Sequence, residues 1–138
     1  MKIFFTTLLM FFASNTLANG SYVDKWQWNN GPECAVYFNP SDEPMLKEYW
    51  DGNGEPPISI SDARKLVLNW VKEEYQGEIS PSIVSYNLTS YHAKGMKTNH
   101  WLYNIRYVKF RNGIPDKDFN ENIVVLMDGA ILSKQCNQ

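Results

Sequence analysis

The residues best suited to chemistry are two cysteines, Cys34 and Cys136. They lie toward opposite ends of residues 19–138. A redox couple normally uses close spacing such as C-x-x-C, whereas this pair is about a hundred residues apart. Two free thiols are the other alternative. In an oxidising compartment an even pair of cysteines usually forms a disulfide. We therefore expect a structural bridge that joins the start of the domain to its last strand.

The two histidines, His92 and His100, flank a short polar segment. Two imidazoles can share a metal ion, but a zinc site needs one or two further ligands. No acid or cysteine lies at a supporting spacing nearby, so we expect partly exposed histidines at strand ends. The chain also lacks a G-x-S-x-G motif for a nucleophilic serine. The sequence thus predicts no catalytic residue, no metal site and no cofactor.

Acidic and aromatic side chains gather before residue 57. Paired carboxylates can cleave glycosides when they face a cleft at a set separation, but crowded acids more often belong to a solvated loop. Tryptophan and tyrosine are common at protein interfaces because they bury a large rigid surface. The candidate partner-binding residues are Trp26, Trp28, Asp42, Glu48, Tyr49, Trp50 and Asp51. The alternative is that these rings pack over the open face of a sheet and complete the core.

The first eighteen residues have the pattern of an export signal. Lys2 precedes an apolar run from residue 3 to 13, and Thr16-Leu17-Ala18 places small residues where a signal peptidase cleaves. The run is too short to span a bilayer comfortably. We expect cleavage near Ala18, with cleavage after Gly20 as the alternative. The sequence therefore predicts a periplasmic or secreted protein with no membrane span in its mature chain.

Residues 19–138 are long enough for one domain with its own core and too short for two. The whole chain of 138 residues has a formal net charge of −2 and a pI near 5.6. This mildly acidic balance argues against nucleic acid as a partner.

A long helix is the clearest predicted element, over residues 58–77. Pro56-Pro57 ends the preceding loop, and Ser59 with Asp62 has the form of a capping box. Gly77 is a natural stop, because glycine readily adopts the left-handed conformation at a helix end. One apolar stripe follows from the helical spacing of Ile60, Ala63, Leu66, Val67, Trp70 and Val71.

After the helix the hydrophobic period changes to two, which predicts an antiparallel sheet over residues 83–135. The expected strands are 83–92, 100–111, 123–127 and 130–133. Asp128-Gly129 between the last two is a strong hairpin signal for a type I′ turn, in which both central residues have positive φ. The predicted fold class is α+β, with one main helix packed on a four-stranded antiparallel sheet. Residues 19–57 read as an irregular N-terminal segment, in which 33–38 could be a short strand.

Two short segments carry a resemblance to known families. Pro57-Ile58-Ser59-Ile60-Ser61-Asp62-Ala63 and the run from Ile123 to Ser133 with its Asp-Gly turn resemble the start and the end of PepSY-type domains. The same order of elements is similar to cystatin-like and NTF2-like folds, including exported immunity proteins of bacterial toxin systems. The match covers roughly residues 57–135. The aromatic N-terminal segment and the cysteines lie outside the pattern, and the Q-x-V-x-G loop of cystatin inhibitors is missing.

Three functions are consistent with these features. The first expectation is an exported non-enzymatic protein that binds an enzyme or toxin as an inhibitor or immunity-type protein. The second is a small-molecule carrier or NTF2-like enzyme, with a pocket between helix and sheet lined by Trp70, Tyr103 and Tyr107 and with Arg106 or a histidine as its polar group. The third is a structural or envelope-assembly module. The resemblance favours the first.

Overall fold

The computed structural model describes residues 21–27, 31–39 and 48–137. Its elements in chain order are β1 (Ser21–Gln27), β2 (Glu33–Phe38), α1 (Ile60–Glu74), β3 (Ser80–Tyr91), β4 (His100–Arg111), β5 (Ile114–Leu126), β6 (Ile131–Leu132) and β7 (Gln135–Cys136). No helix in these ranges is long and apolar enough to cross a membrane.

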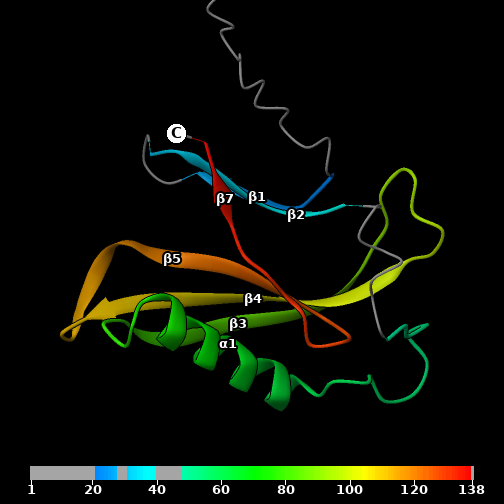
Figure 1. Cartoon of the computed structure of the whole chain (residues 1–138), viewed down its shortest axis with the longest axis horizontal. Coiled ribbons are helices and arrows are strands. Elements are labelled where there is room, and N and C mark those ends of the chain that lie inside the picture. The colour runs from blue at the N-terminus through cyan, green and yellow to red at the C-terminus, as the bar shows by residue number, and fades with distance from the viewer. Residues whose placement is uncertain (1–20, 28–30, 40–47, 138) are drawn as a thin grey trace, which may run out of the picture.

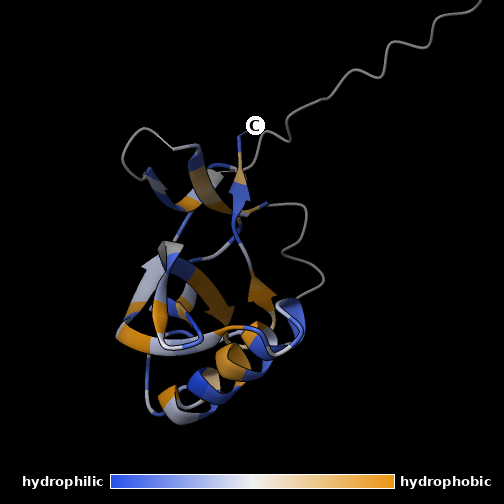
Figure 2. Cartoon of the chain, turned by 90° about the vertical axis from the view of Figure 1, so that its left-hand side faces the viewer, coloured by the Kyte–Doolittle hydropathy of each residue, from blue (hydrophilic) through white to orange (hydrophobic). Residues whose placement is uncertain are grey.

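The elements form three layers (Figure 1). A four-stranded antiparallel sheet in the order β3-β4-β5-β6 lies in the middle, with α1 on one face and a three-stranded sheet, β1-β2-β7, on the other. Figure 2 shows the same layers from the end, with the three-stranded sheet above and α1 below. The α+β class and the helix on a four-stranded sheet are as predicted. The second sheet was not expected.

Each gap between layers is filled by its own apolar cluster. Under α1, Ala63, Val67 and Val71 pack against alternate residues of β4 and β5 such as Ile105 and Ile123. The intervening residues of β4 and β5 point the other way and meet the three-stranded sheet in a second cluster, formed by Val36, Phe38, Ala93, Met96, Leu102, Val124 and Leu126. The central strands are therefore buried on both faces.

The helix begins where its sequence indicates. Ser59 is the N-cap, and its Oγ accepts a hydrogen bond from the Asp62 backbone N–H at 3.1 Å and donates to the Asp62 carboxylate at 2.8 Å. The end differs from the prediction, because Gln76 and not Gly77 is the first residue with a left-handed φ, +52°. The Gly77 N–H then donates to the Lys72 carbonyl at 2.8 Å, which completes a Schellman motif.

The third strand of the sheet starts much earlier than predicted. β5 begins at Ile114, not at residue 123, because Asn112 and Gly113 both have positive φ and form a two-residue hairpin with β4. A bulge between Val108 and Phe110 then shifts the register of this pair. The bulge hides the regular alternation that would have revealed the first half of the strand.

The Asp128-Gly129 turn exists but has another geometry. Only Gly129 has positive φ, so the predicted type I′ turn is wrong. The Gly129 N–H donates to the Leu126 carbonyl, and the Leu126 N–H donates to the Ala130 carbonyl, both at 2.9 Å. This pattern places Met127 and Asp128 at the centre of the turn and Gly129 at a left-handed bulge position.

Residues 19–57 are not an irregular segment throughout. The anticipated short strand is β2, and it pairs with β1 and with β7. A disulfide links Cys34 on β2 with Cys136 on β7, as predicted. The sequence did not predict β1, because a bulge between Tyr22 and Asp24 interrupts its alternation of inward and outward side chains.

Two partly buried hydrogen bonds connect β1 to the four-stranded sheet. Asp24 Oδ2 accepts hydrogen bonds from Asn104 Nδ2 on β4 at 3.0 Å and from Asn122 Nδ2 on β5 at 2.7 Å. A carboxylate that bonds two neighbouring strands specifies how the two sheets are placed over one another.

Candidate protein-binding site

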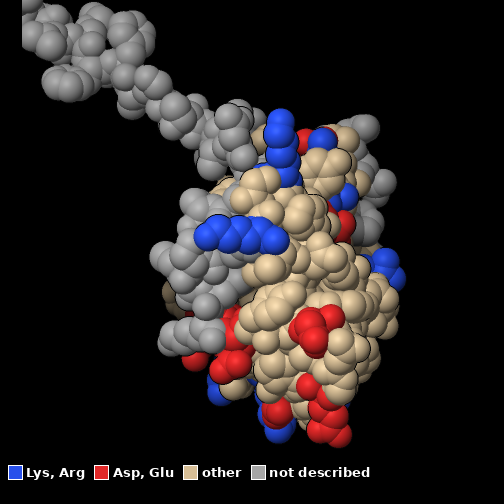
Figure 3. Space-filling model, turned by 90° about the vertical axis from the view of Figure 1, so that its right-hand side faces the viewer, with Lys and Arg blue, Asp and Glu red and all other residues tan. Residues whose placement is uncertain are grey.

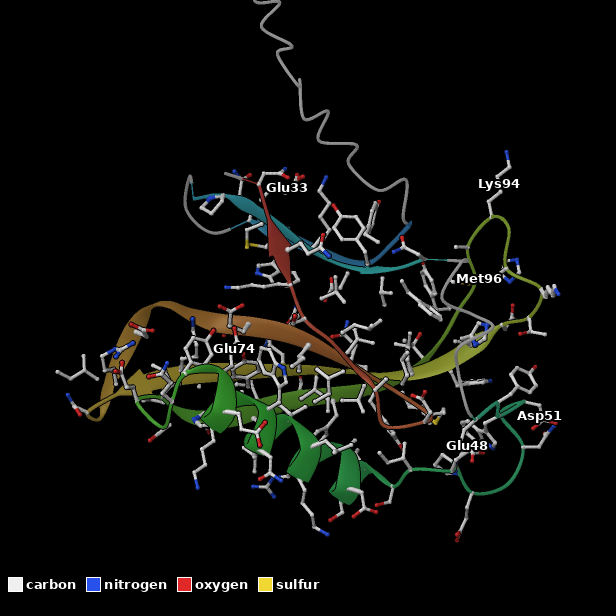
Figure 4. All side chains as sticks on the ribbon, in the orientation of Figure 1. Glu33, Glu48, Asp51, Glu74, Lys94 and Met96 are labelled. Carbon is white, nitrogen blue, oxygen red and sulfur yellow. A yellow bond between two sulfur atoms is a disulfide. The ribbon has the colours of Figure 1, made fainter. Side chains whose placement is uncertain are left out.

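The strongest candidate site is the segment from Glu48 to Asn53, which lies between β2 and α1 at one end of the molecule. We call it the acidic aromatic segment. Figure 4 shows Glu48 and Asp51 at this end, opposite the end that carries Glu74. Glu48, Tyr49 and Asp51 are exposed. These three predicted partner-binding residues therefore lie close together on the surface.

Trp50 attaches the segment to the folded body. Its ring centre lies 5.4 Å from that of Trp101 on β4, and its side chain packs against the cluster under α1. The indole Nε1 donates a hydrogen bond to the Asn53 carbonyl at 2.7 Å. Trp50 is thus a packing residue, and its hydrogen bond to Asn53 fixes the loop that follows it. Only part of its side chain is exposed.

Asp51 and Gly52 shape the loop further. Asp51 accepts hydrogen bonds from the Asn53 side-chain amide and from the Asn53 backbone N–H, both at 2.9 Å. The Asn53 side-chain bond and then the backbone bond lower the pKa of the Asp51 carboxyl below its usual value, so the group is charged near neutrality. Gly52 has φ +91° and lies directly against the Trp101 indole.

Tyr49 is the side chain that this arrangement presents to solvent. It is 57% exposed, and its ring makes an edge contact with His100, 6.2 Å between centres. His100 is itself only 7% exposed and also meets the ring of Phe38 at 5.3 Å. The predicted partly exposed His100 is therefore wrong, because aromatic rings enclose it. His92 is exposed, as expected.

The space beneath the acidic aromatic segment is nearly filled. The cavity there has a volume of about 10 Å³, which is room for about one water molecule. Its lining residues are Glu48, Tyr49, Trp50, His100, Trp101, Leu126 and Met127. The segment therefore offers an outer surface for contact and no internal pocket for a ligand.

The remaining predicted contact residues are dispersed. Trp26 on β1 is half-buried and packs against the cluster between the sheets. Trp28 and Asp42 lie outside the described residues. Figure 3, which faces the end of the acidic aromatic segment, shows both acidic and basic side chains on a largely uncharged surface, with the acidic ones more frequent in its lower half.

The aromatic residues named for a small-molecule pocket, Trp70 included, pack in or against the core cluster under α1. Tyr103 and Tyr107 are buried in the cluster under α1, and the Tyr103 hydroxyl donates to the Ile58 carbonyl at 3.0 Å. Arg106 lies between them on β4 and therefore points to the opposite face, where it is exposed. Among the described residues, no three His, Cys, Asp or Glu side chains are grouped to hold a metal ion.

A buried charge cluster near the C-terminal end of α1 was not anticipated. The Glu121 carboxylate on β5 is almost fully buried and contacts Lys109 Nζ at 2.9 Å and Lys134 Nζ. Burial alone would lower the pKa of Lys109, but the hydrogen bond and charge of Glu121 outweigh it and raise the pKa. Lys109 also lies over the Tyr75 ring, 5.2 Å from its centre.

One feature of the sequence indicates the buried charges. Glu121 has the same parity as Ile123 and Val125, which are core residues of β5. An acid at an inward position of a strand needs a charged or polar partner, and this position was the sequence evidence for a buried charge.

The same surroundings affect Tyr107. Burial raises the pKa of the Tyr107 hydroxyl far above its usual value, and Tyr75 and Glu121 add to the effect.

Comparison with known proteins found few matches to this chain. No family model matches it, and no solved structure matches it. The chain is 35% identical over 60 residues to a tRNA (guanine-N(1)-)-methyltransferase of Rickettsia typhi, and 30% identical over 60 residues to that of Rickettsia akari. Each match covers 44% of this chain and 23% of the relative. The chain thus spans under a quarter of these relatives' length.

Proposed function

We propose that this protein is an exported, non-enzymatic binding protein that acts as an inhibitor or immunity-type protein on a secreted or periplasmic enzyme. The observation that carries the proposal is the exposed Tyr49, flanked by the carboxylates of Glu48 and Asp51 on a loop that is held in place. The disulfide between Cys34 and Cys136 is compatible with the oxidising compartment that export implies.

The chemistry of the segment suggests the kind of surface it contacts. A tyrosine ring buries a large area with little loss of side-chain freedom, and carboxylates around it favour a basic surface. Because Trp50 and Gly52 pack against Trp101, the loop loses little entropy when it binds. We infer that the partner offers a basic cleft, such as the substrate site of an enzyme that acts on an anionic polymer.

The test uses the protein exported with its own N-terminal segment and two matched tyrosine variants. Tyr49→Ala removes the exposed ring from the acidic aromatic segment, and Tyr22→Ala removes a ring that is also 57% exposed but lies on β1. We expect an envelope enzyme to co-purify with the wild-type protein and with Tyr22→Ala, and to be lost with Tyr49→Ala. The wild-type protein should then inhibit the purified enzyme.

Export itself is tested on the same sample by intact mass. Loss of residues 1–18 supports the proposal, as does loss of residues 1–20, whereas a full-length cytoplasmic product contradicts it. Equal loss of the enzyme in both tyrosine variants would place binding elsewhere. A captured RNA in place of an enzyme would also overturn the proposal.

A further inference from the structure

The outer edge of β3 differs from the other sheet edges of this protein. Edge strands expose unpaired backbone N–H and C=O groups, and proteins protect them with short strands, charges, prolines or bulges. In the four-stranded sheet the opposite edge is β6, with two residues, and in the three-stranded sheet one edge is β7, also with two. The fourth edge, β1, carries Asp24, Lys25 and a bulge.

β3 lacks this protection over most of its length. It has twelve residues and contains no charged side chain. Pro81 and the bulge between Ile83 and Ser85 lie in its first half, and the run from Ser85 to Tyr91 pairs regularly with β4. Among the described residues, no strand pairs with the outer side of residues 85–89 in this run.

Apolar side chains also gather on this edge. Val84, Tyr86 and Leu88 are 50%, 42% and 40% exposed, and they are three of the large hydrophobic side chains that remain exposed in the described part of the chain. Tyr86 and Leu88 pair with Ile105 and Tyr103, so they lie on the face of the sheet that carries α1. An open backbone edge and an apolar strip thus coincide.

We propose that the 85–89 edge of β3 pairs antiparallel with the same edge of a second copy of this chain, which forms a two-fold dimer with a continuous eight-stranded sheet. An isologous contact brings each residue against its symmetry partner. In a register centred on Asn87, Tyr86 of each copy lies opposite Leu88 of the other on the same face, and Ser85 lies opposite Thr89. Aromatic–aliphatic cross-strand pairs of this kind stabilise antiparallel sheets.

The charge pattern favours a second copy as the occupant. Two like strands normally repel when they carry charges directly opposite each other, and the charge-free β3 avoids this cost. A two-fold axis perpendicular to the sheet keeps both helices on one face and both three-stranded sheets on the other. The acidic aromatic segment takes no part in the pairing, so the dimer and the proposed enzyme contact are separate.

The test measures the mass of the exported protein by analytical ultracentrifugation over a range of concentrations. Leu88→Lys places a charge at the centre of the proposed contact, and Ile114→Lys places the same charge at a side chain that is 68% exposed on β5. We expect a dimer for the wild type and for Ile114→Lys. Leu88→Lys should weaken dimerisation by an order of magnitude or more, given the lost cross-strand pairs and the added charges.

Hydrogen exchange of the unmodified protein provides a measurement that does not depend on the variants. Protection of the amides of residues 85–89 should rise with protein concentration, while protection in β4 stays constant. A wild-type protein that remains monomeric at millimolar concentration overturns the proposal. So does a dimer that Leu88→Lys leaves unchanged, or β3 protection that does not depend on concentration.

Discussion

At the scale of single residues, one glycine determines how the acidic aromatic segment sits on the protein. An added Cβ at Gly52 would lie 2.8 Å from three atoms of the Trp101 indole, and the backbone has φ +91°. Trp101 cannot easily move, because its ring also packs against Trp50. The position therefore needs a residue with no side chain for both steric and conformational reasons.

The pair Gly52→Ala and Gly54→Ala separates these two effects. Gly54 has φ +70° and nothing within 4 Å of its added Cβ, so its variant reports conformational strain alone, about 1–2 kcal/mol. We expect Gly52→Ala to lose a further 1–3 kcal/mol or so, the usual cost of overpacking. Urea unfolding followed by tryptophan fluorescence measures both. Equal losses would show that the Trp101 contact does not constrain the loop.

At the scale of elements, a buried ion pair links β4 and β5 in addition to the backbone pairing of the two strands. Glu121 is the shared partner of Lys109 and Lys134, while Lys109 is nearly as buried as Glu121 itself. Removing one member of a buried ion pair is costly because the other is left without its compensating charge. The cluster therefore stabilises a particular register and depends on its central carboxylate.

A double-mutant cycle tests this dependence. Glu121→Leu leaves the buried Lys109 without its carboxylate and should lower the free energy of unfolding by about 3–5 kcal/mol. The double variant Lys109→Met/Glu121→Leu should recover much of that loss, since apolar side chains then fill the site. The control is Lys65→Met, which breaks an exposed pair with Asp62 and should change the free energy of unfolding far less, because solvent screens exposed charges. Additive losses at residues 109 and 121 would contradict the account.

At the scale of the whole molecule, the disulfide joins the beginning of the described chain to its end. Cys34 and Cys136 are 102 residues apart in sequence and lie opposite each other on β2 and β7. Because the two apolar clusters lie on opposite faces of the middle sheet, the three-stranded layer has its own set of contacts. The bridge should matter most for that layer.

Replacement of both cysteines by alanine should lower the free energy of unfolding by about 4–5 kcal/mol on the chain-entropy model. We expect the amides of β1 and β2 to lose protection from hydrogen exchange first, while α1 and β4 keep theirs until global unfolding. The comparison is with the oxidised wild-type protein. Uniform loss of protection in all elements would show instead that the two sheets unfold as one unit.

Sequence alone determined those features that rest on neighbouring residues. The N-cap at Ser59 depends on a side chain and a backbone group three residues apart, and the apolar stripe of α1 depends on spacing within one helix. The strands β3 and β4 followed from their alternation, and the disulfide followed from there being only two cysteines. Each of these signals is local or is a matter of counting.

Tertiary structure alone decided the features that depend on long-range pairing. Bulges in β1, β3 and β5 shift the register, and each shift reverses which side chains face inward. The burial of Glu121, the role of Asp24 between the sheets and the contact of Gly52 with Trp101 all follow from such placement. The alternation of β5 places Glu121 inward, but no pattern in the sequence identifies the partners of Glu121, Asp24 or Gly52, because those partners lie far along the chain.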